Sequence, residues 1–130
     1  MARLLLDSTV LIDALRGLPA AQRLRSLRRT GVQPWACVIS VEEIWRGLLP
    51  DEERAARRLF NGLRISPLGV AEGIRAGSWH REFSLQGVTL HQADCLIAAA
   101  AVGIGATLAT ANVDDFPMAE LDLMPWPVGS

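Results

Sequence analysis

Residues 3–13 are Arg-Leu-Leu-Leu-Asp-Ser-Thr-Val-Leu-Ile-Asp, an apolar run followed directly by short polar side chains. The apolar run 3–6 predicts a short buried strand. Asp7, Ser8 and Thr9 then supply the side chains that favour a helix N-terminus. A strand that passes directly into a helix is expected here, with the helix ending at Gly17. On that helix Asp13 stands three residues before Arg16, a spacing at which the two side chains are expected to pair.

The same alternation continues along the chain. Helices are expected at about 9–16, 20–30, 41–49, 51–62, 70–83 and 91–102, and strands at 3–6, 35–39, 64–68, 106–109 and 121–124. Pro67 places the third of these strands at a sheet edge or at its own end. Strands separated by helices imply parallel pairing with right-handed crossovers and helices on both faces. The sequence therefore predicts an α/β protein, a three-layer α/β/α sandwich with a central, mostly parallel sheet, as a single domain over residues 1–130.

The composition excludes several classes of function. All 13 basic residues are Arg, so there is no lysine for a P-loop, a Schiff base or a Ser–Lys dyad. The net charge of −1 is too acidic for a protein that grips nucleic acid by electrostatics alone. No apolar run reaches the roughly 18 residues of a membrane span, so we expect a cytoplasmic protein with no membrane partner. The histidines and cysteines are isolated, which makes a zinc site unlikely and leaves oxygen ligands for any metal.

Carboxylates from four separate segments fall near one edge of the predicted sheet. Asp7 follows the first strand directly, and Asp114 and Asp115 follow the strand 106–109. Glu43 and Asp94 lie in the first turns of two predicted helices. In an open parallel sheet, ligands bind beyond the carboxyl ends of the strands. We therefore expect these acids to form a site there.

Each acid also has a purely structural interpretation. Asp7 suits a helix N-cap, and Ser40-Val-Glu-Glu43 has the sequence of a capping box. Helical periodicity places Glu43 at the margin of the apolar stripe and Glu42 nearly opposite it. Asp94 complements a helix dipole, but it is the only charged side chain between residues 93 and 106, where an unpaired carboxylate is costly to desolvate.

The last acids lie in a turn, where Asp is common for conformational reasons. The pattern alone leaves open whether Asp114 or Asp115 joins the site, and whether Asn112 caps the turn or acts as a neutral ligand. Gathered carboxylates repel one another unless a cation lies between them. Oxygen-only ligation suits Mg²⁺ or Mn²⁺, which activate water toward a phosphodiester. Spacing does not distinguish hydrolysis of a nucleic-acid backbone from phosphatase chemistry.

Four segments taken together resemble the PIN-domain family, and specifically the VapC-type toxins of prokaryotic toxin–antitoxin modules. Their order and spacing match over essentially the whole chain. The segments are Leu5-Leu-Asp7-Ser-Thr-Val-Leu-Ile-Asp13-Ala-Leu-Arg-Gly17, Ile39-Ser-Val-Glu-Glu43-Ile-Trp-Arg-Gly47, Ala93-Asp94-Cys-Leu-Ile-Ala-Ala-Ala-Ala101 and Leu108-Ala-Thr-Ala-Asn112-Val-Asp-Asp115-Phe116.

The resemblance implies a Mg²⁺- or Mn²⁺-dependent endoribonuclease that is inhibited by a cognate antitoxin and forms a homodimer. It assigns catalytic roles to four acids, with the first and third as metal ligands, and supporting polar roles to two further residues. The acids are Asp7, Glu43, Asp94 and Asp115, and the supporting residues are Thr9 and Asn112. The alternatives are a catalytically inactive PIN-like binding module and another Mg²⁺-dependent phosphoryl-transfer hydrolase.

Overall fold

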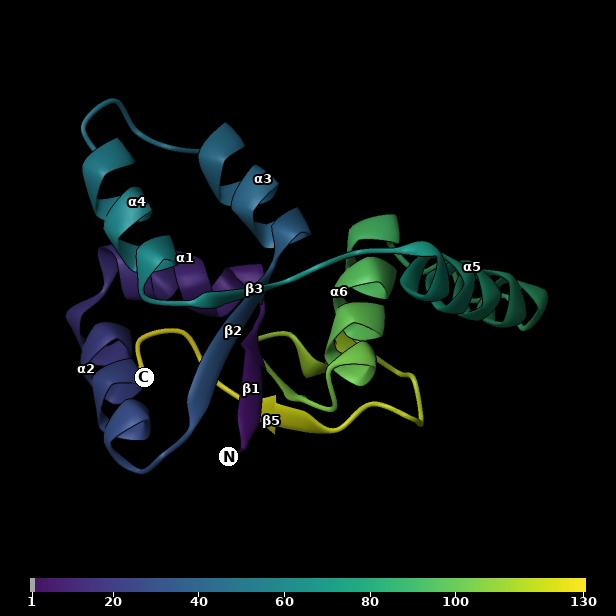
Figure 1. Ribbon diagram of the computed structural model, residues 1–130. Helices are drawn as coiled ribbons and strands as arrows, with labels where there is room; N and C mark the ends of the chain where they lie inside the picture. Colours follow the sequence, from purple (N-terminus) through teal and green to yellow (C-terminus); the bar gives the residue numbers. More distant parts are fainter. Residues whose placement is uncertain (1) are drawn as a thin grey trace.

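A computed structural model describes residues 2–130 of the chain (Figure 1). The strands are β1 (Arg3–Leu6), β2 (Gln33–Cys37), β3 (Arg64–Ser66), β4 (Thr107–Thr110) and β5 (Leu123–Pro125). The helices are α1 (Ser8–Arg16), α2 (Leu18–Arg29), α3 (Val38–Arg46), α4 (Glu53–Asn61), α5 (Val70–Leu85) and α6 (Gln92–Gly103), with a single 3₁₀ turn, η1 (Val113–Asp115).

The strands form one sheet in the order β3-β2-β1-β4-β5, and every neighbouring pair is parallel. The predicted parallel sheet is therefore confirmed. Its central strand is β1, which pairs with β2 on one side and β4 on the other. β3 lies at an edge and ends just before Pro67, as expected of a strand that Pro terminates.

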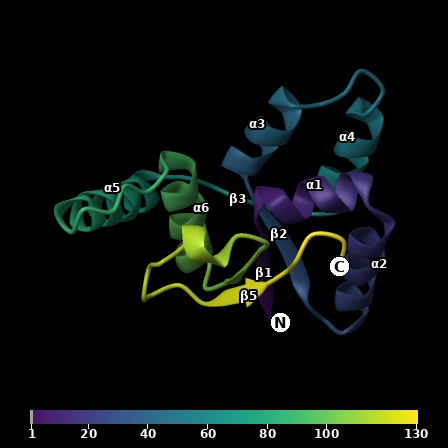
Figure 2. The same cartoon turned by 180° about the vertical axis from the view of Figure 1, so that it is seen from behind.

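Helices cover both faces of the sheet, because successive side chains of each strand point to opposite faces. Leu5 of β1 packs in the core beneath α5 and α6, whereas Leu4 and Leu6 pack in the core beneath α1, α2 and α4. Figures 1 and 2 show α5 and α6 on one side of the sheet and α1, α2 and α4 on the other. The three-layer α/β/α sandwich is confirmed. None of the helices in residues 2–130 has the length and apolar character needed to cross a membrane.

The strand order reverses between β1 and β4. The connection from β1 to β2 passes through α1 and α2 on one face, while the connection from β3 to β4 passes through α5 and α6 on the other. At such a switch point the loops leave neighbouring strands toward opposite faces and open a crevice at the carboxyl ends. The backbone N–H of Asp7 donates to Ala109 O at 2.9 Å, so β1 and β4 end side by side at this switch point.

The boundary between β2 and α3 differs from the prediction. The strand expected at 35–39 occupies 33–37, and α3 begins at Val38. β2 starts early because Gln33 pairs with Arg3, and it ends where Cys37 pairs with Ser66, the last residue of β3. The pairing partners therefore override the strand propensity of Val38 and the residue that follows it.

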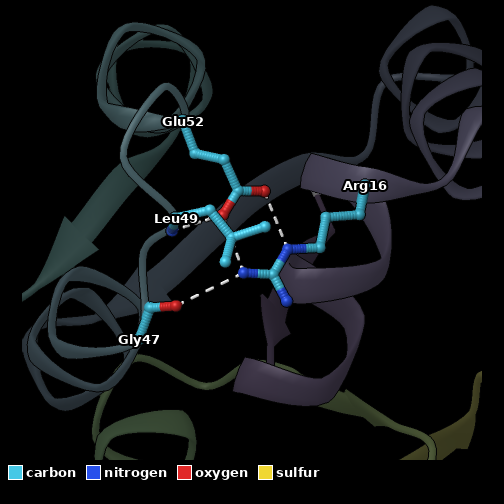
Figure 3. A network of polar contacts seen from close by, with 4 residues as sticks. All are labelled: Arg16, Gly47, Leu49 and Glu52. Carbon is cyan, nitrogen blue, oxygen red and sulfur yellow. Dashed lines mark hydrogen bonds and ion pairs between the residues drawn. The ribbon is translucent and has the colours of Figure 1, made fainter.

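The connection between α3 and α4 is held by Arg16, which lies at the end of α1 (Figure 3). Its guanidinium donates to both carboxylate oxygens of Glu52 at 2.8 and 2.7 Å and to Gly47 O at 3.3 Å, while the Leu49 N–H donates to Glu52 at 2.8 Å. The prediction that Arg16 pairs with Asp13 is wrong. Asp13 instead accepts from the backbone N–H of Gly129 at 2.9 Å.

The Arg16–Glu52 pair predicts a pH-dependent stability. Arg16 and the Leu49 N–H lower the pKa of Glu52 from 4.5 to about 2 by hydrogen bonding to its ionised form. A carboxyl with a lowered pKa stabilises the fold above its unfolded pKa, and this contribution is lost as the pH falls toward the folded value. We expect Glu52→Gln to lower the melting temperature at pH 7, with the difference from the parent shrinking between about pH 4.5 and pH 2.

The matched control is Glu53→Gln, which removes an exposed pair with Arg57 at 3.2 Å. Exposed pairs of this kind contribute little, so its melting temperature is expected to match the parent. Circular dichroism melts across the pH series check both variants. Equal losses in the two variants, or a loss in Glu52→Gln that does not change with pH, would contradict the role given to the network.

Candidate functional site

Asp7 is anchored at the point where β1 passes into α1. It is the N-cap of α1, and its Oδ1 accepts from the Ser8 N–H at 2.7 Å. Its Oδ2 accepts from the hydroxyls of Thr110 at 2.7 Å and Thr9 at 3.0 Å. The side chain is buried, with 5% of the residue exposed. The capping and site interpretations of Asp7 are therefore compatible, because one oxygen caps the helix while the other meets two hydroxyls.

The two threonines tie the loop after β4 to Asp7. The Ala111 N–H donates to Thr9 Oγ1 at 3.1 Å, and the Asn112 N–H donates to Thr110 Oγ1 at 3.0 Å. Asn112 makes no side-chain capping bond to η1, so its backbone, rather than its amide group, takes part in this network. Because η1 follows at once, these bonds also fix the turn that carries Asp115.

Glu43 does not belong to a capping box. The N-cap of α3 is Cys37, and Ser40 lies three residues inside the helix, fully buried. The Glu43 carboxylate instead accepts from the hydroxyl of Ser8 on α1 at 2.7 Å. Glu42 is exposed and pairs with Arg46 at 2.9 Å. The structure thus directs Glu43 toward α1 and Glu42 toward solvent, as the helical periodicity predicted.

Asp94 lies in the first turn of α6, and its pKa is affected by the other acids. Burial is the largest cause that raises its pKa from 3.8 to about 6; the negative charges of Asp7 and Asp115 and, to a smaller extent, Glu43 contribute to the same rise, while His91 opposes it. Carboxylates from three other segments are therefore within electrostatic range of Asp94. Asp114, which precedes Asp115 in the sequence, is not among the groups that shift the pKa of Asp94.

None of the four acids forms an ion pair within residues 2–130. The ion pairs found in residues 2–130 are Arg16–Glu52, Arg46–Glu42 and Arg57–Glu53. Uncompensated carboxylates at one site are the usual setting for a divalent cation.

The donor chemistry at this edge fits Mg²⁺ or Mn²⁺. The carboxylates and the hydroxyls that hold them offer oxygen ligands for a metal ion. In the part of the chain that the structure describes, no three His, Cys, Asp or Glu side chains are gathered closely enough to enclose a metal ion. Mg²⁺ does not need such a cage, because it commonly binds through one or two carboxylates and keeps several waters.

Two hollows flank the N-terminal turn of α6. A cavity of about 180 Å³ lies beside the acids, where Glu43 and Arg46 of α3 face Gln92 and Leu96 of α6. A larger cavity of about 490 Å³ lies between α5 and α6 and shares Gln92 and Leu96 with the first. The smaller cavity adjoins Glu43, so it is the one that belongs to the acidic site.

Thr9 was expected from the sequence, but the other hydroxyls that hold these carboxylates were not. Thr110 and Ser8 donate directly to Asp7 and Glu43, and Ser40 lies 2.8 Å from Ser8. The position of Thr110 in the sequence could have indicated its role. Thr110 is the last residue of β4, and Asp7 follows β1, the strand beside β4 in the sheet. The sequence around Ser40 was misleading, because its capping-box pattern explained this serine as a local helix cap.

Residues 4–120 match the family model described as the PIN domain. The chain belongs to the PIN-domain family. Among curated PIN-domain relatives, ribonuclease VapC10 of Mycobacterium tuberculosis is 39% identical over 119 residues, which cover 90% of this chain and 88% of that protein. Ribonuclease VapC19 of the same species is 33% identical over 129 residues, covering 93% and 97%.

Solved structures of similar fold are toxin–antitoxin complexes. VapBC2 from Rickettsia felis, bound to a DNA fragment from its promoter, superposes with a TM-score of 0.83 at 22% identity over 95% of this chain and 98% of that chain. VapBC-1 from nontypeable Haemophilus influenzae gives a TM-score of 0.80 at 20% identity, with 95% and 98% covered. These likenesses confirm the PIN-like α/β fold.

The raised pKa of Asp94 predicts that this residue destabilises the metal-free protein. A carboxyl whose pKa is raised by folding contributes most stability below its unfolded pKa of 3.8, and that contribution is lost as the pH rises to about 6. We expect Asp94→Asn, in EDTA at pH 7.5, to melt about 2–6 °C above the parent. The gap should close near pH 4.

Asp51→Asn is the control, because Asp51 is exposed and lies outside the site. Its melting temperature is expected to follow the parent at both pH values. Calorimetric melts provide the measurement. An Asp94→Asn protein that is no more stable than the parent at pH 7.5, or that keeps its advantage at pH 4, would show that the carboxylates do not repel as described.

Proposed function

We propose that this chain is a metal-dependent endoribonuclease and the toxin of a toxin–antitoxin pair, with residues 1–130 as a single PIN-like nuclease domain. The main support is the set of four carboxylates near the switch point of the sheet, none of which forms an ion pair within residues 2–130. We assign catalytic roles to Asp7, Glu43, Asp94 and Asp115. Membership of the PIN-domain family and similarity to two proteins named ribonucleases support RNA as the substrate.

Asp7 and Asp94 are proposed as the protein ligands of Mg²⁺ or Mn²⁺. Asp7 comes preoriented, because three donors hold its two oxygens. Asp94 has three charged neighbours among the acids and a raised pKa, so it gains most from a nearby cation. When bound, the ion supplies a lowered pKa for water and polarisation of the phosphodiester.

The remaining site residues orient the reacting groups or accept protons from them. The carboxylates of Glu43 and Asp115 can accept a proton from the attacking water. They can also hold this water molecule in line with the scissile bond. Thr9 supports Asp7 through its hydroxyl, and Asn112 supports the turn that carries Asp115 through its backbone. Burial of Asp7 and the partial burial of Asp94 reduce competition from bulk solvent at this end of the site.

The partners proposed for the chain are RNA as substrate, a cognate antitoxin as inhibitor, and a second copy in a homodimer. Support for the antitoxin comes from the fold, which this chain shares with the VapBC toxin–antitoxin complexes. The homodimer follows from the family resemblance. The cytoplasmic location expected from the sequence is part of the same proposal, since an endoribonuclease toxin has to meet cellular RNA.

The decisive variant is Asp94→Asn. We expect the parent to cleave RNA in Mg²⁺ or Mn²⁺ and the variant to lose at least about 100-fold in rate, because one proposed metal ligand and one site charge are gone. Cleavage of total cellular RNA, followed by mapping of the new ends, measures the activity and identifies the target. Thermal unfolding of the same preparation checks that the variant is folded.

The matched control is Asp114→Asn, which changes the neighbouring exposed carboxylate in the same turn as Asp115. It should cleave at nearly the parent rate, whereas Asp115→Asn should not. Cleavage by Asp94→Asn at the parent rate would refute the proposed site. A parent that binds RNA without cleaving it in either metal would instead favour the inactive PIN-like binding module.

Metal binding itself is testable without RNA. Millimolar Mn²⁺ or Mg²⁺ is expected to raise the melting temperature of the parent by several degrees, because a ligand at about 100 times its Kd stabilises the folded state by about 2.7 kcal/mol. Asp94→Asn should lose most of this shift. NaCl at equal ionic strength is the control for screening. Equal shifts in parent and variant would contradict the ligand assignment.

A further inference from the structure

Three side chains form a line from the interior of the fold to the acidic site. Ser40 Oγ on α3 lies 2.8 Å from Ser8 Oγ on α1, and Ser8 Oγ lies 2.7 Å from Glu43 Oε1, one turn further along α3. Ser40 is fully buried, whereas Ser8 and Glu43 are partly exposed. The line therefore crosses from α3 to α1 and back.

The direction of these hydrogen bonds follows from counting protons. Ser8 has one hydroxyl proton and two neighbours at hydrogen-bonding distance, so it can donate to only one of them. An ionised carboxylate only accepts, so Ser8 donates to Glu43 and Ser40 donates to Ser8. In the reverse direction the proton of Ser40 would have no acceptor, because Ser8 is its one hydrogen-bond partner among the described residues.

Burial makes this direction the favourable one. A hydroxyl left without an acceptor in the interior loses its hydration and gains nothing in return. Ser40 is fully buried, so its donor has to be satisfied inside the protein. A chain of hydrogen bonds that ends on a carboxylate also polarises each member, which strengthens the last bond.

Glu43 depends on this bond more than Asp7 depends on any one of its own. Asp7 accepts three hydrogen bonds, whereas Ser8 is the single hydrogen-bond donor to the Glu43 side chain in residues 2–130. Glutamate also has a longer side chain with more rotatable bonds than aspartate, and ordering it costs more conformational entropy. Without Ser8, nothing in the described structure holds the Glu43 carboxylate toward α1.

We propose that Ser8 and Ser40 are positioning residues, a two-hydroxyl relay from Ser40 through Ser8 that holds the Glu43 carboxylate in the active site. The inference rests on the proposed function for its catalytic consequence. It assigns Ser40, which resembles a helix cap in sequence, to the site. Neither serine touches the substrate in this role.

The first test compares Ser8→Thr with Ser8→Val, which differ by one hydroxyl at nearly constant shape. Ser8→Val is expected to lower kcat by roughly 10- to 100-fold with KM for RNA within about twofold, since a hydrogen bond to a charged group is lost. Ser8→Thr should recover most of the parent kcat. Equal activity of the two variants, or a loss confined to KM, would overturn the relay.

The second test removes the buried end. Ser40→Ala leaves the Ser8–Glu43 bond in place but removes its support, so a smaller loss of kcat, about three- to tenfold, is expected. The same substitution in a Ser8→Val background should cost almost nothing more. The control is Ser26→Ala on the exposed face of α2, which should leave kcat unchanged. Additive losses from Ser8→Val and Ser40→Ala would contradict a relay.

A third test needs no activity. In EDTA, urea unfolding of Ser40→Ala, Glu43→Gln and the double variant measures the coupling between two side chains that share no direct hydrogen bond. The relay predicts a measurable coupling that disappears when Ser8 is also changed to Val. Coupling that persists without Ser8 would overturn the proposal. If the parent cleaves no RNA, the proposed function fails while this cycle still decides whether the relay exists.

Discussion

The central strand β1 and its parallel pairing with β2 and β4 are the constraint on which the rest of the structure depends. Three consecutive leucines, Leu4 to Leu6, are buried on alternating faces, so this one strand contributes to both cores. Its pairing with β4 brings the ends of two strands together, and Asp7 is the next residue along the chain. The position of the acidic site is thus a consequence of how the sheet is ordered.

The acids at this edge illustrate a conflict between stability and function. Burying Asp94 near Asp7 and Asp115 raises its pKa to about 6, which means that its ionised form is disfavoured in the folded protein. The fold offsets part of this strain with hydroxyls rather than with basic residues. Thr110 and Ser8 donate to the carboxylates without neutralising them, which leaves the negative charge available for a cation.

Much of the fold was predictable because its signals are local. Hydrophobic runs, turn residues and helix caps identified the alternation of strands and helices and the acids near one sheet edge, and the family resemblance selected Asp115 over Asp114. The errors arose where a local pattern had a distant competitor. Ser40 has a capping-box sequence, yet strand pairing moves the start of α3 to Val38, and Ser40 becomes buried beside Ser8. Asp13 lies one turn away from Arg16 on the same helix. The Arg16 guanidinium nevertheless donates two hydrogen bonds to Glu52, which lies in the connection between α3 and α4.

Residue periodicity and the alternation of strands and helices along the chain were enough to predict the α/β class, the parallel sheet and the acids expected at its carboxyl edge. Only the tertiary structure decided what holds each carboxylate. Glu43 and its donor Ser8 are 35 residues apart, and Asp7 and Thr110 are 103 apart. A hydrogen bond depends on position in space to within a few tenths of an ångström, and no pattern along the chain encodes which distant hydroxyl will be there.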